Sequence, residues 1–329
     1  MVQTVTINGA REPASTARAG VRMGSEMTFA FDQQSGVQGQ IRSIAIQQVD
    51  RAVAACRGDD DFDAIVHGVR RRCKKLRGLL RLIEPGFEGF DTENKAVRAA
   101  AAGLSGTRDA AVMGGTFEAL LAFDRAEGRE GRIKSGSADA ITAMLQRRAG
   151  EGALNVDRRR LLDAFCETMT EVGERARSWR IKGRGFAAIA GGFELTYRRL
   201  AAGTDAAAAP DATAEALHEW RKHAKYHWHH VSLFTRAAPD LLGDLKHRLD
   251  QLAELLGDHH NLHVLGEHLA ADPDLDSPAA ERTLGDVIAE RQAVLADHAL
   301  ALGRQLTVEK PGAIGRRFKH YWQLLPEKG

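Results

Sequence analysis

Apolar residues recur at intervals of three and four along most of the chain, which is the pattern of amphipathic helices that bury one face. From about Gln38 onward this pattern predicts helices over 38–57, 61–83, 91–105, 108–126, 155–179, 184–202, 213–236, 240–257, 259–272, 280–303 and 312–324. Predicted breaks fall at segments rich in Gly, Pro, Asp or Ser, such as EPGFEGF, AEGREGRIKSGS and DPDLDSP. One segment, MTFAF at 27–31, instead alternates with a period of two and favours a short strand. We therefore expect an all-α protein preceded by an N-terminal extension, residues 1–36.

Size and composition agree with a large helical protein that has a buried core. The chain has 329 residues, of which 43% are apolar and 6% aromatic, and Ala, Leu, Arg and Glu are abundant. Its formal net charge is +2, so the protein as a whole is not a polycation. Any binding by charge must therefore depend on where the charges lie along the chain.

The sequence shows neither a recognisable secretory signal nor a membrane-spanning segment. The segment MVQTVTINGAREPAS has no apolar signal core, and no segment approaches the roughly 18 apolar residues that span a bilayer. The cysteines, Cys56, Cys73 and Cys166, form no C-x-x-C pair and no metal-finger spacing, which is typical of a reducing compartment. These observations predict a cytoplasmic protein with no membrane partner.

Two basic segments recur at a nearly constant offset. VHGVRRRCKKLRGLLRLIEP, starting at residue 66, matches LHEWRKHAKYHWHHVSLFTRAAP, starting at residue 217, with an offset of 151. Some forty residues later, LSGTRDAAVM matches LLGDHHNLHVL at an offset of 152. Four pairs of aligned positions have the same kind of side chain, histidine or a basic residue, in both segments. These pairs are His67 with His218, Arg70 with Arg221, Arg71 with Lys222, and Lys74 with Lys225. Two elements that recur in the same order predict a duplicated helical unit.

On a helical wheel, each basic segment separates into an apolar arc and a polar arc. The polar arc of the first segment holds His67, Arg70, Arg71, Lys74, Arg77 and Arg81. Arg72 and Lys75 lie outside this arc. The polar arc of the second segment holds His218, Arg221, Lys222, Lys225 and His229. A helix held by its apolar side would present each polar arc as a narrow basic stripe.

Repulsion within the first stripe indicates a binding role. No acidic residue occurs from His67 to Leu82, and like charges three or four residues apart repel by roughly a few tenths of a kcal/mol per pair. A bound anion would remove this repulsion, because Arg supplies bidentate donors and Lys a mobile charge. A plain solvated face is the alternative for a single basic run, but the recurrence of the stripe favours anion binding. Two stripes that share a space would suit an extended polyanion, and their histidines would make contacts that depend on pH.

With these residues in view, the chain resembles the CHAD family, the conserved histidine α-helical domain. The matching segments are HGVRRRCKKLRGLLRLIE, RDAAV, TYRRL, LHEWRKHAKYHWHHVSLF and LGDHHNLHVL, and the resemblance covers roughly 38–305. It implies an all-α fold of two pseudo-symmetric helical bundles in one compact domain, 37–329, with halves of about 37–180 and 181–329. It also implies inorganic polyphosphate as the ligand, held without catalysis or a cofactor in a central basic groove or pore, and association with polyphosphate granules.

Carried over position by position, the resemblance implies polyphosphate contacts from both stripes and from the TYRRL segment. These residues are His67, Arg70, Arg71, Lys74, Arg77, Tyr197, Arg198, Arg199, His218, Arg221, Lys222, Lys225 and His229. The second basic helix departs from the family pattern, since Tyr226, His227 and Trp228 replace a usual Arg-Leu-Arg, and HHN replaces an Asn-Asp pair. We therefore expect the second stripe to be less cationic and more dependent on pH than the first.

A metal-dependent phosphohydrolase is the alternative function, because all histidines except His67 lie beyond residue 217. His259 and His263 stand one helical turn apart and could bind a metal together with Asp258 or His229. However, the sequence contains no H-E-x-x-H, P-loop or G-x-G-x-x-G signature. Specific nucleic-acid binding is disfavoured by the near-neutral charge and by the lack of a recognisable motif.

Three further residues are expected to have structural roles. His227 falls in the middle of an apolar arc, which predicts a hydrogen-bonded core histidine. Trp220 is expected to pack in the core. Asp109 is expected to cap a helix, although it could instead pair with a basic residue such as Arg70.

Overall fold

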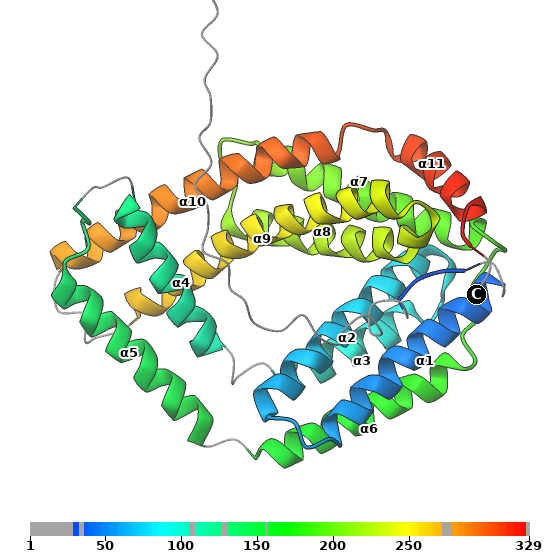
Figure 1. The fold of residues 1–329 in the computed structure, drawn as a ribbon, viewed down its shortest axis with the longest axis horizontal. Coiled ribbons are helices and arrows are strands. Elements are labelled where there is room, and N and C mark those ends of the chain that lie inside the picture. The colour runs from blue at the N-terminus through cyan, green and yellow to red at the C-terminus, as the bar shows by residue number, and fades with distance from the viewer. Residues whose placement is uncertain are drawn as a thin grey trace, which may run out of the picture.

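The computed structural model describes residues 29–32, 36–104, 109–126, 130–154, 157–271 and 278–326, and all regular secondary structure in these ranges is helical (Figure 1). The α-helices are α1 (Val37–Cys56), α2 (Phe62–Ile83), α3 (Phe90–Ala102), α4 (Asp109–Asp124), α5 (Ser135–Leu154), α6 (Arg158–Ala176), α7 (Ala187–Ala207), α8 (Ala214–Phe234), α9 (Pro239–Ala270), α10 (Pro278–Leu306) and α11 (Pro311–Gln323). Short 3-10 turns follow α2 and α8. The predicted all-α class is confirmed. No described helix is both long and apolar enough to span a bilayer.

Capping side chains and prolines determine where several helices begin. Asp61 caps α2 by accepting a hydrogen bond from the backbone N–H of Asp63 at 3.0 Å. Thr213 caps α8 in the same way, through the N–H of Ala216 at 3.2 Å. Proline occupies the first turn of α9 and α11, where its missing N–H costs no hydrogen bond. The two basic helices therefore begin at side-chain caps that the sequence supplies. Asp109 begins α4, but its side chain lies outside the described residues.

Three expectations about the elements were wrong. Helix α5 was not predicted, because Gly and Ser near its ends resemble a loop, yet its apolar positions pack against α4. Helix α9 runs unbroken where two helices were predicted, because Gly257 lies inside the helix rather than ending it. The described part of the predicted strand, 29–31, is not a strand. Instead Phe31 is fully buried, and its backbone N–H donates to the carbonyl of Leu233 at 2.8 Å.

Two groups of four helices form the body of the molecule (Figure 1). In the first, α1, α2, α3 and α6 pack around one core, and in the second, α7, α8, α9 and α10 pack in turn against one another. Helix α2 joins the groups by packing against α7 and α8. The hairpin of α4 and α5 packs on the far ends of α9 and α10, where a second apolar cluster forms. The predicted first half of the chain thus contributes α4 to the helices of the second half.

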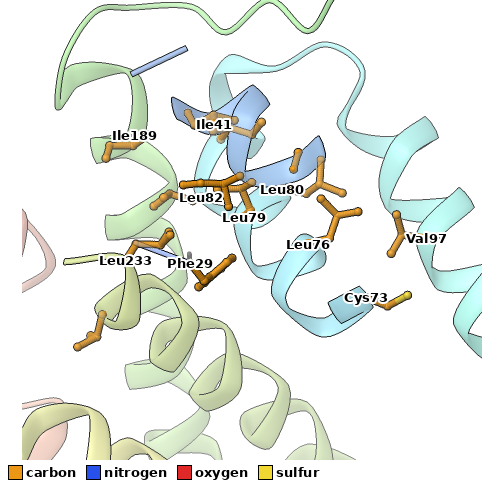
Figure 2. Packing of buried hydrophobic residues seen from close by; sticks show 14 of the residues in the cluster. Phe29, Ile41, Cys73, Leu76, Leu79, Leu80, Leu82, Val97, Ile189 and Leu233 are labelled. Atoms are coloured by element: carbon orange, nitrogen blue, oxygen red, sulfur yellow. The ribbon is translucent and has the colours of Figure 1, made fainter. Parts of the chain in front are cut away.

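Helix α2 packs against α1, α3, α7 and α8, and its apolar face is buried between them. Figure 2 shows Leu76, Leu79 and Leu80 among residues of α1, α3, α7 and α8. Each of these leucines is 0% exposed, and burying a leucine side chain stabilises the fold by roughly 1.5 to 3 kcal/mol. The polar face of α2 is therefore held in a fixed direction by the core behind it.

Helices α2 and α8 cross at Gly78 and His229. A Cβ atom at Gly78 would lie 2.7 Å from the Cβ of His229, so glycine permits a close approach of the two backbones. His230 closes the crossing with a hydrogen bond of 2.9 Å between its Nε2 and the carbonyl of Gly78. The two helices that carry the predicted stripes are therefore in direct contact.

Candidate anion-binding site

The polar side of α2 carries the first predicted stripe. Val69, Cys73 and Leu76 are buried behind it. His67, Arg71 and Lys74 are exposed, while Arg70 and Arg77 are half-buried. The aliphatic stems of half-buried arginines lie along the protein surface and their guanidinium groups reach the solvent. The stripe thus has the amphipathic arrangement that the helical wheel predicted.

The second stripe on α8 is more buried than the first. His218, Arg221, Lys222 and Lys225 are half-buried. His229 does not lie on the polar surface as predicted, because it is only 5% exposed and packs against Gly78 at the crossing. Its ring also meets those of Phe29 and Trp228 edge-on. His229 is therefore part of the helix contact.

Cations from both helices act electrostatically on His229. Burial lowers the pKa of His229 well below its ordinary value, and the neighbouring His230, Lys75, Lys225 and Lys74 lower it further. The ammonium groups that act on this imidazole come from α2 and from α8. Lys74 and Lys225 thus both act on an imidazole that lies where the two helices cross.

Carboxylates partner several cations of α8. Lys222 forms an ion pair with Glu219 on its own helix. Lys225 donates to Asp250 of α9 at 2.6 Å. The guanidinium of Arg221 packs over Gly257 of α9, since a Cβ there would lie 3.0 Å from its Nη2. A side chain at residue 257 would displace Arg221, and this close approach explains the glycine inside α9.

Two histidines stack at the outer end of the second stripe. The rings of His218 on α8 and His260 on α9 have their centroids 3.9 Å apart. Burial lowers the pKa of His218, and Lys222 and Arg221 lower it further. Burial also lowers the pKa of His260 to about 4, with further contributions from His218 and Arg221. Both imidazoles are therefore neutral at pH 7 in the free protein.

The three residues of TYRRL on α7 lie in different surroundings. Tyr197 is 1% exposed, and its hydroxyl donates to the backbone carbonyl of Glu309 at 3.0 Å, so its role here is in packing. Arg198 is exposed. Arg199 makes two hydrogen bonds to Glu84, of 3.0 and 3.2 Å. Although burial raises the pKa of Glu84, Arg199 and Arg81 hold it below its ordinary value.

Aromatic and amide groups of neighbouring helices contact the inner end of the first stripe. The guanidinium groups of Arg77 and Arg81 lie 5.8 and 5.5 Å from the ring centroid of Tyr226 on α8. Arg77 also donates to the amide oxygen of Asn94 at 3.1 Å. Tyr226, which replaces a basic residue of the family pattern, therefore still touches the first stripe.

Sequence reasoning missed two residues near the stripes. Lys75 was placed outside the first stripe, yet its buried side chain lies beside His229 and its Nζ is 5.4 Å from the ring centroid of Phe29. His260 was given no role, although it stacks on His218. No periodicity identifies either residue, because each owes its position to a helix distant in sequence.

The two structural expectations for α8 residues agree with their burial. His227 is 1% exposed and lies against Phe193 and Tyr197, although its Nδ1 has no hydrogen-bond partner among the described residues. Trp220 is 1% exposed. As to the metal hypothesis, the described residues hold no group of three or more His, Cys, Asp or Glu side chains that could bind a metal ion. The Nε2 atom of His263 lies 3.5 Å from Oε1 of Glu267 on the same helix.

Comparisons with known proteins agree on the fold. The model of the CHAD domain family matches residues 41–270. PptA from Streptomyces chartreusis superposes with a TM-score of 0.55 and 16% identity, covering 84% of this chain and 100% of that one. The CHAD domain of the plant Ricinus communis gives a TM-score of 0.52 and 18% identity, covering 84% of this chain and 93% of that one. No curated protein sequence matches the chain. At these identities the two structures show a shared fold alone.

Proposed function

This chain belongs to the CHAD domain family, for which polyphosphate binding is a known property, and we propose that it binds inorganic polyphosphate without catalysis. In this proposal the ligand lies along the basic stripes of α2 and α8, in a groove between the two helix groups. Binding would also bring the protein to polyphosphate granules.

The crossing of the two basic helices at Gly78, His229 and His230 carries the proposal. Two basic helices far apart would offer two separate patches, whereas helices that touch at Gly78 bring their two basic stripes close to one place, which supports a shared binding surface. From His67 to Arg77, α2 advances about 15 Å at 1.5 Å per residue. A linear polyanion can follow a row of this length, while a single small phosphate would contact only a part of it.

Phosphate contacts along the stripes would use two kinds of donor. Arg70 and Arg71 offer planar guanidinium groups that bind two phosphate oxygens at once. Lys74 and Lys225 offer flexible point charges. Each neutralised phosphate releases condensed counterions, so the affinity should fall steeply as the salt concentration rises.

Titration of long-chain polyphosphate at two salt concentrations tests the proposal. The double variant Arg70→Glu with Lys222→Glu reverses one charge in each stripe and should abolish binding at physiological salt. Arg159→Glu with Arg160→Glu is the matched control, because it changes the net charge equally on exposed residues of α6, a helix that packs on α1 and α3. Retained affinity in the stripe variant, or equal loss in both variants, would refute the assignment.

Two further assays separate this function from its alternatives. Polyphosphate chain length should stay constant during incubation with the protein, with or without a chelator; shortening that a chelator prevents would favour a metal-dependent phosphohydrolase. Short duplex DNA or RNA should not displace long-chain polyphosphate at equal phosphate concentration, and displacement would remove the specificity for polyphosphate.

A further inference from the structure

A small pocket lies beside the crossing of α2 and α8. It has a volume of about 200 Å³, and its walls include Phe29, Trp228 and the cations Lys75, Arg236 and Lys246. None of the described residues that line it is acidic. Because drug-sized ligands fill pockets of roughly 300 to 1,000 Å³, this pocket suits a small group.

Positive charge is concentrated around the aromatic walls of this pocket. The Nζ atoms of Lys246 and Lys225 lie 4.9 and 5.6 Å from the ring centroid of Trp228. The Nζ atom of Lys75 lies 5.4 Å from the ring centroid of Phe29. Among the described residues, neither Arg236 nor Lys246 has a carboxylate within ion-pair distance. Lys225 is neutralised by Asp250, but Arg236 and Lys246 share the pocket and repel each other, and an anion bound between them would reduce this repulsion.

Trp228 adds a hydrogen-bond donor that has no acceptor. Its Nε1 is buried and makes no hydrogen bond to any described residue. A buried N–H group without an acceptor destabilises the protein, so such groups are rare and call for an explanation. An oxygen atom of a bound anion would accept this hydrogen bond.

The pocket adjoins the second stripe at Lys225. Lys225 lies over the indole of Trp228, which forms a wall of the pocket. The same Lys225, together with Lys74, acts on His229 where the two stripes meet. A polyanion that follows the stripes would therefore reach the pocket at the crossing.

We propose that this pocket binds the terminal phosphate of a polyphosphate chain whose internal phosphates lie along the stripes. The inference rests on the proposed function and adds recognition of the chain end. A terminal phosphate has a second ionisation near pH 6 and carries about −1.5 to −2 charges at pH 7, whereas an internal phosphate has one ionisable oxygen. The cations around Trp228 and its free N–H group match the more highly charged end of the chain.

Calorimetric titration with linear polyphosphate of one defined length tests this assignment. One sample has free ends, and in the other both ends are capped as phosphoramidates. The wild-type protein should bind the free-ended chain about tenfold more tightly, which is the loss expected for one charge-assisted hydrogen bond. Lys246→Met, and Trp228→Phe, which keeps an aromatic ring but removes the N–H donor, should lower this ratio towards one. Arg70→Glu is the control, because it should weaken the binding of both chains by the same factor.

The outcomes separate this inference from the proposed function. Equal affinity of the wild-type protein for free and capped chains would overturn the chain-end site and leave polyphosphate binding intact. Failure to bind either chain would refute the proposed function itself. Orthophosphate that binds in a Lys246-dependent way, without any preference for free ends, would assign the pocket to free phosphate and also overturn the inference.

Discussion

The stripes of α2 and α8 meet at one crossing, yet they are charged in different ways. On α2, neither Arg70 nor Arg71 has a described carboxylate within ion-pair distance. On α8, Lys222 is paired with Glu219 and Lys225 with Asp250. Arg70 and Arg71 of the first stripe therefore have no acidic partner among the described residues, whereas Lys222 and Lys225 of the second stripe are held in ion pairs.

Under the proposed function, this difference gives the two stripes different parts in binding polyphosphate. If polyphosphate binds as proposed, a phosphate can approach Arg70 and Arg71 without displacing a carboxylate of the described residues. On α8 it must compete with carboxylates, and an exposed ion pair contributes roughly 0 to 1 kcal/mol that its exchange gives up. We infer that α2 supplies most of the affinity, and that α8 adjusts it through its acidic partners and its histidines.

The largest expected effect comes from removing charge on one stripe at a time. Arg70→Gln with Arg71→Gln should weaken polyphosphate binding about a hundredfold, because two unpaired, bidentate donors are lost. Lys222→Gln with Lys225→Gln should weaken it only about tenfold, since these lysines also lose the ion pairs that oppose binding. Titration calorimetry at constant salt measures both changes. Equal losses would show that the ion pairs of α8 do not compete with the ligand.

The contact between the stripes can be broken at Gly78. Gly78→Ala would place a Cβ atom 2.7 Å from the Cβ of His229, so the helices must move apart at a cost of roughly 1 to 3 kcal/mol in the free energy of unfolding. Gly68→Ala, on the same helix, is the matched control, because a Cβ there meets no atom within 4 Å. It should stabilise α2 by roughly 0.5 to 1 kcal/mol. Urea unfolding measures both changes, and effects of the same sign would argue against a close crossing at Gly78.

A smaller effect is expected from pH, and it concerns the second stripe. His218 and His260 are neutral in the free protein at pH 7, because burial and nearby cations lower their pKa values. A bound polyanion favours the imidazolium form and raises both pKa values, so binding takes up protons. The affinity should therefore rise as pH falls from the pKa in the complex towards about 4, the pKa of free His260. The rise is at most about tenfold per pH unit for each proton taken up.

Titrations between pH 7.5 and 5.5 with long chains measure this effect, since chain ends then contribute little to the charge. The groups that act on the two rings, besides the rings themselves, are Arg221, Lys222, Glu219, Glu215 and His263. His260→Gln should flatten the profile while the affinity at pH 7.5 changes little. An unchanged profile in this variant would place the pH dependence elsewhere.

Much of the fold could be predicted from local pattern, as α2 shows. Its apolar positions repeat with a helical period and are indeed buried, and the burial of His227 and Trp220 was predicted from the same reasoning on α8. The pattern gave a wrong prediction where the identity of a residue is determined by contact with a residue distant in sequence. Gly257 resembled a helix stop, but it is small because Arg221 packs over it.

The candidate site could be predicted only in part, for a similar reason. The helical wheel identified the cations of both stripes. It could not show that His229 is buried where α2 and α8 cross, or that the buried Lys75 acts on its imidazole. The acidic partners are also non-local, since Asp250 is 25 residues from Lys225. Charge along one helix predicts which groups are cationic, while their availability depends on helices that pack beside it.

Asp250 provides the finest test of the difference between the stripes. Asp250→Asn keeps the size of the side chain but removes the charge that holds Lys225, so it should strengthen polyphosphate binding about threefold, within the range of an exposed ion pair. Asp244→Asn makes the same change in net charge at an exposed position of the same helix and is the matched control. It should strengthen binding by a smaller factor that high salt removes, because it acts only at long range. Equal gains in the two variants would mean that Lys225 is not restrained by Asp250, and that the two stripes differ in composition but not in availability.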